Sequence, residues 1–218
     1  MAVTLRPDQL FTNHRDTYQR FIRAVFYPQG LRSFFLASPV VRDELRVLDA
    51  GCGTGAVTLA LREAMARRHV LPRATHGFDL TPAMLDLFRE TLRKRAIEDV
   101  ALAQANVLDL STLPTDWVDY DLIVSASMLE YVARDKFVSA LQQLRSRLAN
   151  DGVFLLFITR RNPLTRLLIG HWWQSNLYTA KELAEAFRAA GFSQFGFRNF
   201  PLAAANLSLW GHIVEARY

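Results

Sequence analysis

The sequence contains one cysteine in 218 residues, Cys52, so no internal disulfide can form. A chain without disulfides suits a reducing compartment, and we expect a cytoplasmic protein. No hydrophobic run approaches the length of a transmembrane helix, and the first residues lack the apolar core of a signal peptide. The histidines at positions 14, 69, 76, 171 and 212 lack the spacing of metal ligands, so no metal site is expected.

Blocks of like charge are also missing, although 26 basic residues outnumber 21 acidic ones and give a net charge of +5. The short basic clusters are Arg67-Arg68, Arg93-Lys94-Arg95 and Arg160-Arg161. The first two fall near predicted helix ends, where cations complement the helix dipole and face water. The charge pattern therefore favours a solvated helix surface, with a nucleic-acid partner as the alternative. With half of its residues hydrophobic, the chain suits one globular unit with a full core.

The strongest local signal is a glycine turn between a strand and a helix. Arg46–Leu48 reads as a short buried strand, and glycines follow at positions 51, 53 and 55. Ala56–Arg68 then carries apolar residues at helical spacing. Such a turn lets the backbone lie against a ligand, and the helix N-terminus directs free N–H groups to the same place. We expect a nucleotide-like ligand at Gly51–Gly55, with a sharp turn that binds nothing as the alternative.

Two ligand classes use this kind of turn. Gly51-x-Gly53-x-x-Ala56 satisfies the dinucleotide fingerprint, but Asp49 stands two residues before the first glycine. A carboxylate there repels a pyrophosphate and suits a ligand that carries an ammonium group. The stretch resembles the glycine-rich motif of class I S-adenosylmethionine-dependent methyltransferases of the small-molecule type. The resemblance covers about residues 45–218 and implies S-adenosyl-L-methionine as the cofactor.

The next strand brings a second carboxylate toward the same turn. Arg73–Phe78 reads as this strand and closes on Asp79, after which Thr81 and Pro82 begin a helix that runs to about Arg95. Asp79 then stands at the carboxyl end of a strand, where open α/β sheets bind ligands. The family resemblance implies that Asp79 holds the ribose of the cofactor and that Leu80 packs on the adenine.

The later segments continue the alternation of strands and helices. Asn106 follows the third strand, at a position where the family often has an aspartate that contacts the adenine amino group, and its carbonyl oxygen can accept instead. The residues after the fourth strand, Ser127 onward, resemble the place where cofactor and substrate meet.

The remaining predicted elements continue to the end of the sequence. The strands are Val100–Ala105, Leu122–Ala126 and Val153–Ile158, followed by the final strands Phe192–Phe200 and Leu207–Ala216. The helices are Asp135–Leu148 and 180–190, and a capping box at Thr179 begins the second of them.

These elements predict a doubly wound, seven-stranded, mostly parallel Rossmann-like α/β sheet with an antiparallel last strand. Residues 46–218 would form the cofactor-binding methyltransferase domain, and residues 1–45 an N-terminal helical segment. Within that segment Gln9–Phe26 is predicted helical, Tyr27–Gly30 breaks the helix, and Leu31–Ala37 resumes it. The resemblance implies that the segment covers the substrate pocket; a helix docked on the sheet is the alternative.

The candidate site residues fall into three groups. The cofactor group comprises Asp49, Gly51, Cys52, Gly53, Gly55, Asp79, Leu80, Asn106, Val107 and Ser125, with Cys52 as a small turn filler rather than a nucleophile. The substrate group comprises Tyr18, Met128, Tyr131 and Trp172. The candidate general bases are Glu130 and His171, whose alternatives are a helix-start charge and a packed or solvent-facing loop histidine.

The predicted function is S-adenosylmethionine-dependent methylation of a small, apolar or aromatic acceptor. The Asn/Asp-Pro-Pro-Tyr motif of many amino-methylating enzymes is missing after the fourth strand, which reads Ser125-Ala126-Ser127-Met128. Three alternatives stay open: methylation of RNA or protein, a nicotinamide-dependent oxidoreductase, and a non-catalytic nucleotide-binding protein. Leu164–Ile169 with Trp172-Trp173 also permits peripheral contact with an anionic membrane.

Overall fold

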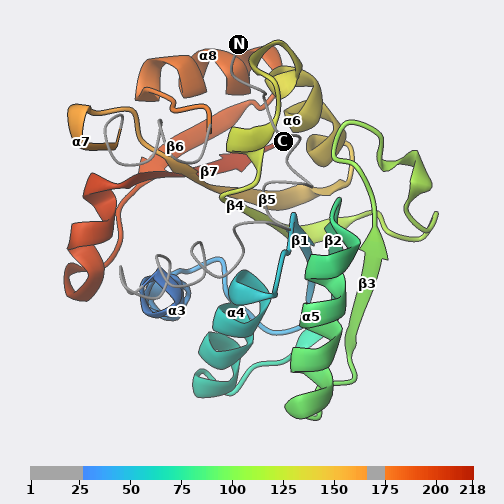
Figure 1. The fold of residues 1–218 in the computed structure, drawn as a ribbon. Coiled ribbons are helices and arrows are strands. Elements are labelled where there is room, and N and C mark those ends of the chain that lie inside the picture. Colours follow the sequence, from blue (N-terminus) through green and yellow to red (C-terminus); the bar gives the residue numbers. More distant parts are fainter. Residues whose placement is uncertain (1–26, 166–174) are drawn as a thin grey trace.

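The computed structural model describes residues 27–165 and 175–218, which fold around one seven-stranded sheet (Figure 1). The strand order is β3-β2-β1-β4-β5-β7-β6. Strands β1 to β5 pair in parallel, and β7 lies antiparallel between β5 and β6. The predicted mostly parallel sheet with an antiparallel last strand is confirmed. The strands are β1 (Leu45–Ala50), β2 (Pro72–Asp79), β3 (Val100–Gln104), β4 (Tyr120–Ala126), β5 (Leu148–Thr159), β6 (Gln194–Arg198) and β7 (Gly211–Arg217).

Helices cover both faces of the sheet (Figure 1). Helices α3, α4 and α5 lie on one side, and α6 and α8 lie on the other. Their bounds are α3 (Tyr27–Ala37), α4 (Ala56–Arg67), α5 (Pro82–Lys94), α6 (Phe137–Arg145), the single turn α7 (Pro163–Thr165) and α8 (Ala180–Ala189). Short 3-10 helices are η1 (Leu110–Thr112), η2 (Leu129–Tyr131), η3 (Arg134–Lys136) and η5 (Leu202–Leu209).

Strand β5 shows why the sheet is buried on both faces. Phe154 and Leu156 point into the core beneath α6 and α8, whereas Leu155 and Phe157 point into the core that contains α3 and α4. All four side chains are at most 3% exposed. A strand between two layers needs apolar residues at every position, which explains the continuous hydrophobic run that predicted it.

Local chemistry sets the start of α8 as the sequence predicted. Thr179 Oγ1 accepts a hydrogen bond from the Glu182 amide at 3.2 Å, and the Thr179 amide donates to Glu182 Oε2 at 2.7 Å. This reciprocal pair is a capping box, which satisfies two free N–H groups at the helix end.

Several predicted boundaries are wrong; β5, for example, begins at Leu148 and not at Val153. Tyr27–Gly30 does not break a helix but belongs to α3, because proline is tolerated in a first turn where no N–H is needed. The helix predicted for Asp135–Leu148 begins with the 3-10 turn η3 and ends at Arg145. Residues 207–209 belong to η5, so the last strand begins at Gly211.

The helix predicted over Gln9–Phe26 lies outside the described residues. Within the described part of the chain, the helices are too short or too polar to cross a bilayer.

Candidate cofactor and acceptor site

A cavity of about 840 Å³ lies at the carboxyl ends of the central strands. Its walls include Gly51–Thr54 after β1, Phe78–Thr81 at the end of β2, 105–108 after β3 and 126–128 at the end of β4. The order β3-β2-β1-β4 makes these four strand ends neighbours, although they are far apart in the sequence. The volume is within the range of ligand pockets, roughly 300–1,000 Å³.

The three glycines of the turn have different surroundings. A Cβ atom at Gly51 would lie 2.3 Å from Met128 Cγ, and one at Gly55 would lie 2.1 Å from Phe88 Cε2. A Cβ atom at Gly53, where φ is +51°, would meet nothing within 4 Å. Gly53 therefore leaves open space in the cavity wall, whereas Gly55 makes room for α5. Gly55 does not line the cavity, which differs from its predicted role in ligand contact.

Asp79 connects the glycine turn to the cavity. Its Oδ2 accepts a hydrogen bond from the Gly53 amide at 2.9 Å, and its Oδ1 accepts one from the Thr81 amide at 2.9 Å. Burial raises the pKa of Asp79, and the hydrogen bonds from Thr81 and Gly53 oppose that rise. Each carboxylate oxygen keeps a further lone pair. Asp79 lines the cavity and has the acceptor capacity for a pair of ligand hydroxyl groups.

Asp49 lies beneath the turn, not in the cavity wall. It is 1% exposed, and its Oδ2 accepts from the Thr58 amide at 3.1 Å and from the Thr58 hydroxyl at 2.6 Å. Its Oδ1 has no hydrogen-bond partner among the described residues. Burial raises the pKa of this carboxyl to about 7. Asp49 supports the first turn of α4 through Thr58, and its direct contact with the cofactor stays a prediction.

The predicted adenine-side residues lie together on the wall after β2 and β3. Leu80 is 43% exposed, and Asn106 and Val107 line the same cavity. Asn106 Oδ1 accepts from the Leu108 amide at 3.0 Å and closes a turn of the kind that asparagine favours. Ser125, in contrast, is fully buried within β4 and does not line the cavity, a position that does not favour its predicted contact with the cofactor.

Cys52 lines the cavity but is only 5% exposed. Burial raises the pKa of its thiol well above the ordinary value, and the carboxylates of Asp49 and Asp79 add to the effect. The protonated thiol is a poor nucleophile, in keeping with a small residue that fills the turn.

Glu130 does not face the cavity. It is 3% exposed, and its Oε2 accepts from the Thr159 amide at 2.9 Å. Burial raises its pKa. The carboxyl joins η2 to the end of β5, a position that does not favour the predicted role of Glu130 as a general base. The other candidate base, His171, and the predicted substrate residues Tyr18 and Trp172 lie outside the described residues.

Comparison with known proteins identifies the family. Residues 47–152 match the model of a family described as "Methyltransferase domain". The chain carries a methyltransferase domain of the class I S-adenosylmethionine-dependent type. This assignment sets aside the nicotinamide-dependent oxidoreductase as an alternative.

Two curated relatives of the methyltransferase come from Streptomyces. The aklanonic acid methyltransferase DauC of Streptomyces sp. (strain C5) is 29% identical over 118 residues, which is 54% of this chain and 50% of the relative. The indolepyruvate C-methyltransferase of Streptomyces griseus is 32% identical over 122 residues, which is 55% of this chain and 34% of the relative. The matched region therefore spans half or less of these relatives.

Solved structures share the fold of the methyltransferase at low sequence identity. The structure titled "PigF with SAH" has a TM-score of 0.77 and 20% identity, and covers 100% of this chain and 63% of its own. The YcgJ protein from Bacillus subtilis has a TM-score of 0.63 and 16% identity, and covers 87% of this chain and 99% of its own. These likenesses establish the Rossmann-like architecture.

The segment after β4 completes the cavity of the methyltransferase. The predicted substrate residues Met128 and Tyr131 line it, and Tyr131 belongs to η2. Several further residues line the cavity that are not among the candidate site residues predicted from the sequence: Tyr27, Pro28, Gln29, Arg32, Ser127, Val132 and Ala133. Of these, Ser127 and Val132 lie in the segment after the fourth strand, which resembles the meeting place of cofactor and substrate.

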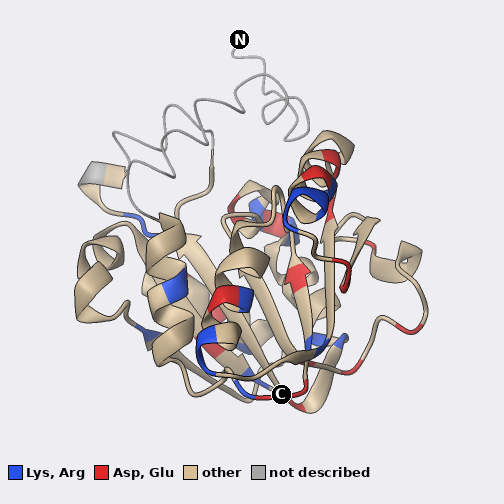
Figure 2. Cartoon of the chain, turned by 90° about the horizontal axis from the view of Figure 1, so that it is seen from below, with Lys and Arg blue, Asp and Glu red and all other residues tan. Residues whose placement is uncertain are grey.

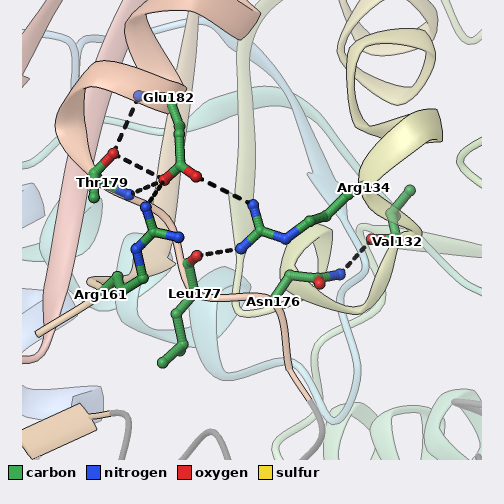
Figure 3. A network of polar contacts seen from close by, with 7 residues as sticks. All are labelled: Val132, Arg134, Arg161, Asn176, Leu177, Thr179 and Glu182. Atoms are coloured by element: carbon green, nitrogen blue, oxygen red, sulfur yellow. Dashed lines mark hydrogen bonds and ion pairs between the residues drawn. The ribbon is translucent and has the colours of Figure 1, made fainter. Parts of the chain in front are cut away.

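A polar network outside the cavity holds this segment in place (Figure 3). Arg134 donates to the carbonyl oxygen of Leu177 at 2.6 Å and pairs with Glu182 at 3.4 Å, while Arg161 pairs with Glu182 at 2.8 Å. The side-chain amide of Asn176 donates to the carbonyl oxygen of Val132 at 2.8 Å. Residues 176–182 thereby fix the backbone that carries the cavity wall after β4.

Charges on the methyltransferase are interspersed, not segregated, on the face that Figure 2 shows. Several of them form exposed ion pairs, such as Arg62 with Asp99 at 2.7 Å and Lys94 with Glu90 at 2.7 Å. Within the described ranges, no group of three or more histidine, cysteine or acidic side chains is arranged to hold a metal ion.

Proposed function

We propose that this methyltransferase transfers a methyl group from S-adenosyl-L-methionine to a small-molecule acceptor with an apolar or aromatic body. The observation that carries the proposal is the open wall at Gly53, where a Cβ atom would meet nothing, directly beside the Asp79 carboxylate. A ligand backbone or sugar can approach Gly53 without a side chain in its way.

The residues of the cavity fit the proposed cofactor. Asp79 would accept the ribose hydroxyl groups, while Leu80, Asn106 and Val107 would frame the adenine. Strand order places this wall, after β2 and β3, at the end of the cavity opposite Met128, which follows β4. The β4 end is therefore the proposed meeting place of the methyl group and the acceptor.

When bound, S-adenosylmethionine supplies a methyl group on a sulfonium: the electron pair of the acceptor forms the new bond, the sulfur keeps the pair of the broken bond, and any proton on the reacting atom leaves. The protein has to hold donor and acceptor in line and exclude water. The apolar residues Met128, Val132 and Ala133 support such a water-poor acceptor end. Glu130 plays no part in this proposal because it faces away from the cavity.

The relatives favour a small molecule over RNA or protein as the acceptor. Their names refer to aklanonic acid and indolepyruvate, which are small molecules. Indole-3-pyruvate, an aromatic 2-oxo acid, is therefore a suitable first test acceptor, and a polycyclic phenol tests the wider class of aromatic acceptors.

The test combines binding with turnover. Calorimetric titration with S-adenosylhomocysteine is expected to give a micromolar Kd, with no binding of NADH or NADPH. Incubation with S-adenosylmethionine and either indole-3-pyruvate or 1,8-dihydroxyanthraquinone is then expected to produce S-adenosylhomocysteine and a methylated product, detected by mass spectrometry. Methylation of total RNA but of neither compound would contradict the small-molecule proposal. Binding without turnover on any acceptor would favour the non-catalytic alternative.

A further inference from the structure

Ser127, directly after β4, has an unusual backbone conformation in the cavity wall. Its φ is +53°, in the left-handed region that side chains rarely adopt. Five described residues other than glycine share a positive φ, and of these Ser127 is the one that lines the cavity. The others are Glu44, His69, Ala96 and Asp119.

The surrounding structure holds Ser127 in this conformation from both sides. Its amide donates to the carbonyl oxygen of Phe157 on β5 at 3.0 Å, which continues the β4–β5 ladder. On the other side, the Tyr131 amide donates to the carbonyl oxygen of Met128 at 3.0 Å, which closes η2. A glycine would adopt this conformation at lower cost. Strained residues of this kind concentrate at functional sites, so the presence of a hydroxyl at this position calls for a reason.

The hydroxyl of Ser127 is available to a ligand. It is half-buried and has no hydrogen-bond partner among the described residues. Tyr27 and Tyr131, which line the same cavity, already make interactions of their own. Gln29 is exposed. Ser127 thus presents one donor and two acceptor lone pairs next to the apolar wall formed by Met128, Val132 and Ala133.

We propose that the Ser127 hydroxyl hydrogen-bonds to an oxygen of the acceptor and so orients it for methyl transfer. The inference rests on the proposed function and narrows its substrate class to compounds with a hydroxyl or carbonyl oxygen on an apolar body. A few polar groups in an apolar pocket are the usual means of fixing ligand orientation. A serine hydroxyl can serve either kind of oxygen, because it donates and accepts.

The test compares two probes that differ in one oxygen, 2-naphthol and its isostere 2-methylnaphthalene. Their affinities for the complex of the protein with S-adenosylhomocysteine are measured by ligand-observed NMR. The unmodified protein is expected to bind 2-naphthol about 3- to 10-fold more tightly, the range of one neutral hydrogen bond. Ser127→Ala and Ser127→Gly are both expected to abolish this preference while leaving the Kd for S-adenosylhomocysteine within about twofold.

The two variants separate the hydroxyl from the backbone strain, since alanine retains the strain and glycine relieves it. His69→Gly, at an exposed position of positive φ outside the cavity, is the matched control and should keep the preference. An undiminished preference in either Ser127 variant, or no preference in the unmodified protein, overturns the proposal. Failure of the unmodified protein to bind S-adenosylhomocysteine overturns the proposed function as well, and the titration reveals which of the two has failed.

Discussion

Two carboxylates beside the glycine turn, Asp79 and Asp49, make different contacts. Asp79 supports the turn and also faces the cavity. Its carboxylate accepts hydrogen bonds from the amides of Gly53 and Thr81, and it lines the cavity wall. Asp49 stands two residues before the turn but is fully enclosed with Thr58. Two carboxylates that look equally placed in the sequence therefore have different partners in space.

Asp79→Ala is expected to raise the Kd for S-adenosylhomocysteine by about 10- to 100-fold, as for the loss of a charge-assisted hydrogen bond of about 1.5–3 kcal/mol. Calorimetry measures the effect. Asp86→Ala, which removes an exposed carboxylate paired with Arg89 at 2.8 Å outside the cavity, is the control and should leave the Kd unchanged. An unaltered Kd for Asp79→Ala would exclude Asp79 as a cofactor ligand.

At the scale of elements, the turn between β1 and α4 is also the contact surface for α5. Phe88 of α5 is fully buried, in a cluster with Cys52, Leu85 and Leu92, and it occupies the space that a Cβ atom of Gly55 would take. The absence of a side chain at Gly55 thus sets how closely α5 approaches the turn. The role of Gly55 is therefore to let α5 pack against the turn between β1 and α4.

Gly55→Ala is expected to lower the free energy of unfolding by about 2–5 kcal/mol, through the strain of an L-residue at φ +89° and overpacking against Phe88. Thermal melting should show a fall in Tm of about 5–15 °C. Gly196→Ala in β6, where a Cβ atom meets nothing within 4 Å, is the control and should melt near the unmodified protein. Equal Tm values for the two variants would contradict the packing role of Gly55.

At the scale of the whole molecule, the sheet is covered on both faces, so carboxyl groups within it are buried. Buried carboxyl groups make the free energy of unfolding depend on pH. The raised pKa of Asp49, about 7, means that the folded protein retains a proton that the unfolded chain releases above pH 4. The contribution of Asp49 to the free energy of unfolding therefore falls as pH rises from about 4 to 7, by at most about 4 kcal/mol.

Asp49→Asn is accordingly expected to flatten the pH dependence of stability between pH 4.5 and 8, and to stabilise the protein at pH 8. Urea denaturation at a series of pH values measures both effects. Asp109→Asn is the control: hydrogen bonds from Ser111 lower the pKa of the exposed Asp109, and its replacement should leave the slope caused by Asp49 in place. The idea fails if Asp49→Asn retains the slope of the unmodified protein.

The sequence by itself determined the succession of strands and helices along the chain, the glycine turn, and the start of α8. These features depend on neighbours along the chain: apolar runs, the backbone freedom of glycine, and the hydrogen bonds between Thr179 and Glu182. The carboxyl-edge position of Asp79 also followed from sequence, because open α/β sheets bind ligands where their strands end.

Only the tertiary structure decided which of these residues face the cavity. Gly53 is open and Gly55 is packed because Phe88, more than thirty residues later, lies against one and not the other. Glu130 turns inward because the Thr159 amide at the end of β5 offers a partner there, and Ser127 is held in its left-handed turn by Phe157. Side-chain direction depends on long-range packing and on the pairing of buried polar groups, and neither is encoded in local spacing.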